Sequence, residues 1–150
     1  MASKLKTMIL LLLVVVVVCA TFQMCIPKEY FQFAYLKNGT TNDTLEIQFN
    51  SRDSRWTLLP AKDVKIASVN HVSKIDEDNL KFLIDNAYSS IKVFRHDTCV
   101  AHWQGSMSNM GDSIHDFFNH DAWQGKIHGD EYLYYFTIVD ADLNPIPQTD

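Results

Sequence analysis

Apolar and polar residues alternate over several short stretches of this chain, and each such stretch predicts a strand with one buried face. The segment Leu45 to Phe49 alternates strictly, and Phe31 to Leu36 before it is apolar and aromatic. Between them, Lys37 to Thr44 is rich in Asn, Asp, Gly and Thr, which favour turns. We therefore expect a hairpin or a corner between two sheets at this point.

A further strand is expected over residues 64–69, after the break that Pro60 makes following an apolar run at 56–59. Simple alternation would place three of its residues on one face and three on the other. The two expected sets are Val64, Ile66 and Ser68, and Lys65, Ala67 and Val69.

Three more stretches complete the expected strands. Residues 91–94 and 99–103 predict a hairpin that turns at 95–98, and Glu131 to Val139 has the aromatic and β-branched content of a buried strand.

The period changes from 2 to 3.6 between Asp76 and Tyr88, which predicts one amphipathic helix. Its apolar positions are Leu80, Leu83, Ile84, Ala87 and Tyr88. A single helical turn is also expected after Ser113, which would cap it. In that turn Ile114, Phe117 and Phe118 would face inward, with Trp123 following as an anchor.

Together these elements predict a mainly β fold. We expect a small β-sandwich or a partly open barrel of about six or seven strands with one or two short helices. The expected boundaries are a single β-rich domain over 25–143 and a C-terminal tail over 144–150, which contains two prolines.

The first 24 residues have the pattern of an export signal, which would form an apolar helix. Lys4 and Lys6 precede thirteen apolar residues from Met8 to Ala20. That length suits the apolar core of a signal peptide and is short for a membrane span, which needs about 20 residues. The segment also has no polar side, so it does not read as a helix of the domain core.

The end of the signal leaves several alternatives open. Cleavage after Ala20 would give plain secretion, whereas a lipoprotein would carry its acyl chains on Cys25 or, as the weaker candidate, on Cys19. An uncleaved anchor is the remaining alternative. If Cys25 is retained without a lipid, it could pair with Cys99 in an oxidising compartment.

Composition and charge narrow the function classes. The chain has 150 residues with a net charge of -5, and removal of Lys4 and Lys6 takes the charge to -7. An acidic domain is a poor match for nucleic acid or an anionic lipid surface. Its length is sufficient for one domain and too small for two.

Several common catalytic and cofactor motifs are absent from the sequence. There is no Gly-x-Ser-x-Gly elbow, phosphate loop or Gly-x-Gly-x-x-Gly, so no cofactor is expected. Histidines at 96, 102, 115 and 120 suggest a metal site, but His115 and His120 are five residues apart and would not share a helical face. We therefore interpret these four residues as surface histidines: His96, His102, His115 and His120.

Two other features have both a structural and a functional interpretation. Asn38 and Asn42 each begin an Asn-x-Thr acceptor pattern for N-glycosylation, which would matter in a eukaryotic secreted protein. We favour turn formation for both. An aromatic group that could bind sugar or peptide is assigned mainly to the core: Phe117, Phe118, Trp123, Tyr132, Tyr134, Tyr135 and Phe136.

Several segments together resemble the small uncharacterised lipoproteins abundant in Bacteroidetes. The segments are Cys25 to Pro27, Lys37 to Leu45, Thr57 to Pro60, Val93 to Thr98 with Trp103, Ile114 to Trp123 and Tyr134 to Leu143. The resemblance implies acylation of Cys25, for example with palmitate, and a domain held on a membrane in the periplasm or outside the cell. It implies no enzymatic activity.

We therefore expect a membrane-anchored, non-catalytic domain of the cell envelope. It would bind a partner protein, a glycan or a toxin that it neutralises. Two alternatives remain: a small secreted hydrolase or metal-dependent enzyme that uses its histidines, and a secreted eukaryotic glycoprotein.

Overall fold

The computed structural model describes residues 29–50, 52–72, 77–108 and 115–144, together with Leu12 and Val14. The expected lipidation residues Cys19 and Cys25, the remainder of the export signal and the tail beyond Asn144 lie outside the described residues. Leu12 and Val14 are helical and exposed. Across the described ranges, no helix is long and apolar enough to cross a membrane.

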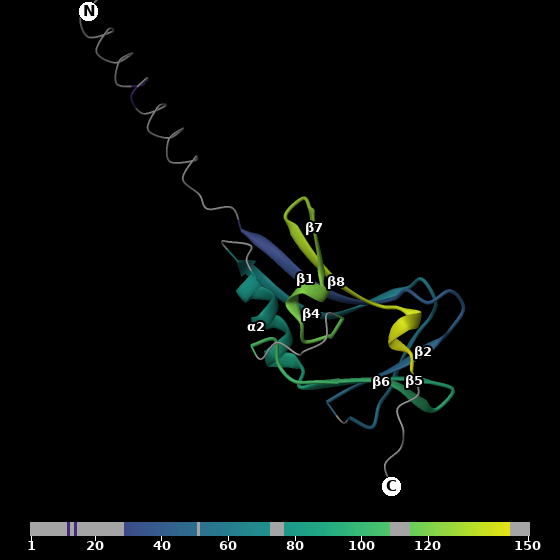
Figure 1. Cartoon of the computed structure of the whole chain (residues 1–150). Helices are drawn as coiled ribbons and strands as arrows, with labels where there is room; N and C mark the ends of the chain where they lie inside the picture. Colours follow the sequence, from purple (N-terminus) through teal and green to yellow (C-terminus); the bar gives the residue numbers. More distant parts are fainter. Residues whose placement is uncertain are drawn as a thin grey trace, which may run out of the picture.

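The described residues form eight strands in two four-stranded sheets, one packed over the other (Figure 1). The first sheet has the order β4-β1-β8-β7, with β4 at Asp63–Val72, β1 at Tyr30–Asn38, β8 at Glu131–Ile138 and β7 at Gln124–His128. The second has the order β3-β2-β5-β6, with β3 at Trp56–Leu58, β2 at Leu45–Phe49, β5 at Ser90–Arg95 and β6 at Thr98–Gln104. Neighbours are antiparallel except β1 and β8, which run parallel.

This arrangement confirms the predicted mainly β sandwich. The strand count was too low, because β7 was not expected. All five residues of β7 are exposed, so its sequence has no alternation to mark it as a strand. The turn after β1 leads into the other sheet, and it is therefore a corner and not a hairpin.

A bulge in β4 corrects the predicted faces of that strand. Ala34 and Tyr35 of β1 pair with Ala67 and Lys65, so Ile66 has no opposite residue. The extra residue reverses the alternation beyond it. As a result Ser68 is exposed, whereas Ala67 and Val69 pack against the core with Val64 and Ile66.

The predicted helix is present as α2, Glu77–Ala87, and it buries Leu80, Leu83 and Ile84 as expected. The helical turn expected after Ser113 is not formed by the described residues that follow it. Phe117 and Phe118 are buried, but they lie in turns. The next described helical segment after Ser113 is instead a 3₁₀ turn at His120–Ala122, and the side chain of Asn119 caps it. Ser113 and Ile114 lie outside the described residues.

Aromatic rings join the two sheets in the core. Phe136 of β8 meets Trp103 of β6 edge-on, with ring centroids 5.4 Å apart, and it contacts Phe117 and Trp123 at 5.4 and 5.6 Å. The indole of Trp123 donates a 2.9 Å hydrogen bond to the Phe117 carbonyl. The loop 115–123 therefore closes one end of the sandwich.

The hairpin β5-β6 forms as predicted. Its two turn residues, His96 and Asp97, have φ of 49° and 64°. Two successive positive φ values are typical of the tight turn whose twist matches antiparallel strands.

Candidate functional site

A groove lies between α2 and the strands β3 and β4, and Figure 1 shows α2 alongside β4. It consists of two adjoining hollows of about 380 and 300 Å³ that share Ile66, Asn86 and Ala87. We call it the aromatic groove. Its other lining residues are Phe49, Arg52, Ser54, Trp56, Tyr88, Ala67, Ser68, Val69, Phe82 and Leu83.

A row of aromatic rings runs from the surface of this groove to the core. Trp56 is 41% exposed and contacts the buried Phe49 edge-on at 5.4 Å. Phe49 in turn lies 4.6 Å from Tyr88, and Tyr88 lies 6.2 Å from Phe117. The exposed indole thus rests on rings that core packing holds in place.

Asn50 fixes the position of α2 against this row. Its φ of 52° is a left-handed conformation that Asn tolerates better than most residues. The side chain donates to the Ala87 carbonyl at 2.7 Å and accepts from the Ser89 N–H at 2.7 Å. The end of β2 and the end of α2 are therefore joined directly, which positions Tyr88 between them.

The larger polar groups of the groove come from Arg52, Asn86 and Tyr88, and Ser54 and Ser68 line it as well. The Asn86 amide donates to the Phe82 carbonyl at 2.8 Å, and the Tyr88 hydroxyl donates to the Ile66 carbonyl at 2.5 Å. Burial raises the pKa of Tyr88, and the positive charge of Arg52 opposes that rise. No ion pair of the Arg52 guanidinium occurs among the described residues. The groove therefore offers apolar surface and one guanidinium that makes no ion pair with the described residues.

The predicted histidine candidates do not gather into one site. His96 lies in the β5-β6 turn, and His120 lies on the 3₁₀ turn with its Nδ1 3.3 Å from an exposed carboxylate of Asp121. His102 of β6 and His115 line the same hollow, which is separate from the aromatic groove. Within the described ranges, no group of three or more His, Cys, Asp or Glu residues is arranged to hold a metal ion.

Cys99 is a half-buried residue of β6. Its Sγ lies 3.5 Å from the Ala101 carbonyl, and burial raises the pKa of the thiol. A raised pKa disfavours the reactive thiolate. Pairing with Cys25 stays a prediction, since Cys25 lies outside the described residues.

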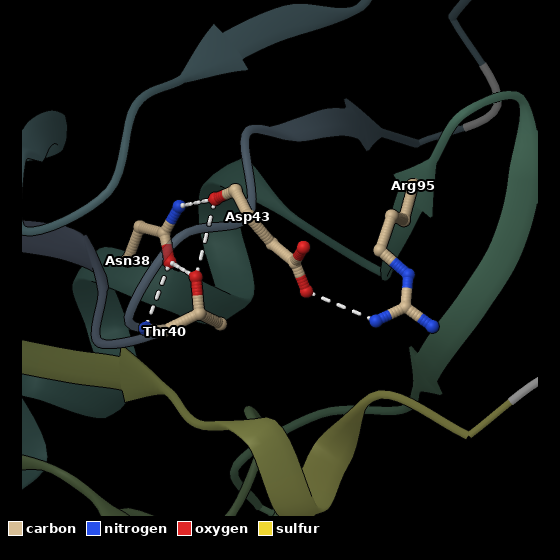
Figure 2. Close-up of polar contacts among 4 residues, drawn as sticks. All are labelled: Asn38, Thr40, Asp43 and Arg95. Atoms are coloured by element: carbon tan, nitrogen blue, oxygen red, sulfur yellow. Dashed lines mark hydrogen bonds and ion pairs between the residues drawn. The ribbon is translucent and has the colours of Figure 1, made fainter.

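The two acceptor asparagines have different surroundings. Asn38 is fully buried, and its Nδ2 donates to the carbonyls of Asp43 and Leu58 at 2.8 and 3.0 Å. Its Oδ1 accepts from the N–H and hydroxyl of Thr40 (Figure 2). The atom that would carry a glycan is thus enclosed in the fold, and Asn38 organises the corner. Asn42 is exposed, and its glycosylation stays a prediction.

An ion pair extends the same corner to β5. Asp43 accepts from Arg95 at 2.9 Å (Figure 2), with both side chains about one-third exposed. The turn-forming interpretation of this segment is therefore supported by six hydrogen bonds of its side chains.

Most of the aromatic residues that the sequence analysis assigned to the core are buried. Phe117, Phe118, Trp123, Tyr134 and Phe136 are buried. The other two members, Tyr132 and Tyr135, are half-buried on β8.

No family model, curated protein or solved structure matches this chain. The aromatic groove was not predicted from sequence. Tyr88 lies about 30 residues after Arg52 and Trp56, and only the fold brings it to them. The one available signal was Trp56 itself, a large apolar residue in a short stretch with no clear alternation.

Proposed function

We propose that this chain is an exported, lipid-anchored domain that binds a protein partner through the aromatic groove. The observation that carries the proposal is the exposed indole of Trp56 on the buried ring of Phe49, beside the Arg52 guanidinium, which forms no ion pair within the described ranges. Trp and Arg are the residue types most enriched among the energetic centres of protein interfaces.

A polypeptide with an apolar side chain next to a carboxylate fits this groove best. The apolar group would cover Trp56 and Phe49, and the carboxylate would meet Arg52. The second hollow extends the groove along α2, where Phe82 is 62% exposed. An extended segment of several residues can therefore contact both hollows.

Anchoring rests on the N-terminal pattern. Acylation of Cys25 would hold the domain at a membrane, and more than one acyl chain makes such anchoring firm. Incorporation of labelled palmitate that disappears in Cys25→Ala tests this part. A mature protein whose mass corresponds to a chain beginning at Thr21 would contradict it and favour plain secretion.

Selection of displayed peptides on the immobilised full chain tests the binding part. We expect enriched peptides with an aromatic or large aliphatic residue near Asp or Glu. Their affinity should fall at least about tenfold in Trp56→Ala. Ile127→Ala is the matched control, because Ile127 is also a 60% exposed apolar side chain but lies on β7.

Arg52→Gln separates the charge from the apolar floor. It should weaken binding of the acidic peptides and leave their Asn or Gln analogues unchanged. Peptides that bind Trp56→Ala as tightly as the parent chain would refute the groove as the site. Saturable glycan binding that is lost in Trp56→Ala would replace the protein partner with a sugar.

A further inference from the structure

A second hollow of about 300 Å³ lies beside β6, and it contains a histidine held by a buried carboxylate. His115 Nδ1 is 2.7 Å from Asp142 Oδ1, and the side chain of Asp142 is only 8% exposed. The other carboxylate oxygen accepts from the Val139 N–H at 2.8 Å. Asp142 is therefore fixed by its own backbone turn and not by His115 alone.

Two contacts position the His115 ring: Asp142 at its edge and Phe136 against its face. It stacks on Phe136 with ring centroids 5.0 Å apart and an interplanar angle of 27°. A carboxylate at Nδ1 selects the tautomer with the proton on that nitrogen, which leaves Nε2 as an acceptor. Because the His115 side chain is 37% exposed, solvent has access to the ring.

The edge of β6 borders the same hollow, and His102 of this strand lines it. β6 pairs only with β5 among the described strands, so alternate N–H groups point away from the sheet. Gly105 N–H donates to the Ser89 carbonyl, and the register pairs His102 with Lys92. Successive N–H groups of β6 point alternately towards and away from β5. Since the N–H of Gly105 points towards β5, that of His102, three residues earlier, points away from it to the open side of the strand.

The lining favours a neutral substrate. The described part of the lining consists of Val100, Ala101, Trp103, Ala141 and Asn144 in addition to His102, His115 and Asp142, and it contains no Lys or Arg. A phosphate ester needs cationic groups at the reacting centre, and the Asp142 carboxylate would repel an anion. Among the described residues that line the hollow there is no Ser or Cys, so the mechanism below uses water as the nucleophile.

We propose that His115 is a general base that hydrolyses small neutral acyl esters in this hollow, with Asp142 as its positioning residue. His115 Nε2 takes a proton from water as the water oxygen bonds to the acyl carbon, and the carbonyl π pair moves to its oxygen. The His102 N–H donates to that oxyanion. The carbonyl re-forms, the bond to the leaving alkoxide breaks, and the alkoxide takes the proton from Nε2. The products are one carboxylic acid and one alcohol.

This activity is independent of the aromatic groove and of the proposed binding function. It also departs from the expectation of a non-catalytic domain. What sequence could not show is that Asp142, 27 residues away, lies against His115.

Hydrolysis of p-nitrophenyl acetate by the full chain in mild detergent tests the proposal. We expect saturable kinetics near neutral pH and a fall in kcat/KM of at least about tenfold in His115→Gln. His120→Gln is the matched control, because His120 also lies beside an aspartate but is outside the hollow, and its kcat/KM should stay within about twofold. Equal rates for the parent chain and His115→Gln would overturn the proposal, as would a fall of the same size in His120→Gln.

Asp142→Asn tests the positioning role with a spectroscopic readout. In this variant the Val139 N–H continues to donate to the side-chain oxygen, so the new NH₂ group faces His115 Nδ1. Because that NH₂ donates, Nδ1 must accept, and the proton of the neutral ring moves to Nε2. We expect the ring ¹⁵N shifts of His115 to exchange their protonated and unprotonated positions, together with at least about a tenfold loss of kcat/KM. An unchanged tautomer with reduced activity would assign Asp142 a purely structural role and contradict the mechanism.

Discussion

Asn38→Ala should destabilise the domain by about 3 to 4 kcal/mol, an unusually large effect for a residue in a turn-forming segment. The substitution removes four hydrogen bonds. The Thr40 hydroxyl keeps a partner in the Asp43 carbonyl at 3.1 Å, and that carbonyl is only partly buried. The Leu58 carbonyl and the Thr40 N–H lose a buried partner, and each unsatisfied group costs about 1–3 kcal/mol.

Urea unfolding of the full chain in mild detergent measures this loss. With a slope of about 1.5 kcal/mol per molar, the midpoint should fall by about 2 M at constant slope. Asn42→Ala is the control, because Asn42 belongs to the same segment but is exposed, and its effect should stay within about 0.5 kcal/mol. A loss below about 1 kcal/mol in Asn38→Ala, or equal losses in the two variants, would refute the assignment of Asn38 as the organiser of the corner.

Two other regions allow equally direct tests. Gly125→Ala would put a Cβ against the Tyr132 hydroxyl and 2.8 Å from its Cζ, so we expect a loss of about 1–3 kcal/mol in thermal or urea unfolding. The same change should cost little in a Tyr132→Ala background, and an additive loss there would contradict the predicted clash. Burial, and then the charge of Lys92, lowers the pKa of His102 below its ordinary value of 6.5. Protonation of His102 therefore opposes folding: its contribution to stability is intact above pH 6.5 and is lost as the pH falls through the lowered pKa. In an NMR titration the His102 midpoint should lie below 6.5 and rise in Lys92→Ala, whereas an unchanged midpoint in that variant would remove Lys92 as a cause.

The sequence predicted those elements whose burial follows a regular period. β2 alternates without interruption, and α2 places Leu80, Leu83 and Ile84 on one face, so both were recognised. β4 was recognised as a strand, but its faces were wrong beyond Ile66. A bulge depends on how the partner strand pairs, and that information lies about 30 residues away in β1.

The periodicity of apolar residues did not predict the exposed or irregular elements. β7 has no buried residue, and its pairing with β8 is what makes it a strand. Around Phe117, bulky inward residues suggested a helical turn. The structure buries the same rings without a helix, because a turn closed by Asp116 places them equally well: its carboxylate accepts from the Phe118 N–H at 2.7 Å.

The two candidate sites could not be predicted from the sequence for the same reason. A sequence displays local spacing, and both sites depend on residues from separate segments. The aromatic groove joins Trp56, Ile66 and Tyr88. The hollow beside β6 brings His115 to Asp142 and to the edge of that strand. His115 and His102 were noted from sequence, but their shared hollow follows only from the fold.

The parallel pairing of β1 with β8 sets the order in which this domain can be completed. Phe31 lies opposite Glu131, 100 residues later in the chain, and the two strands occupy the middle of the first sheet. β1 therefore lacks one of its neighbours until β8, 100 residues later, has been made. Contacts so distant in sequence form slowly. A chain that emerges N-terminus first during synthesis therefore keeps its first sheet incomplete until β8 has followed β1.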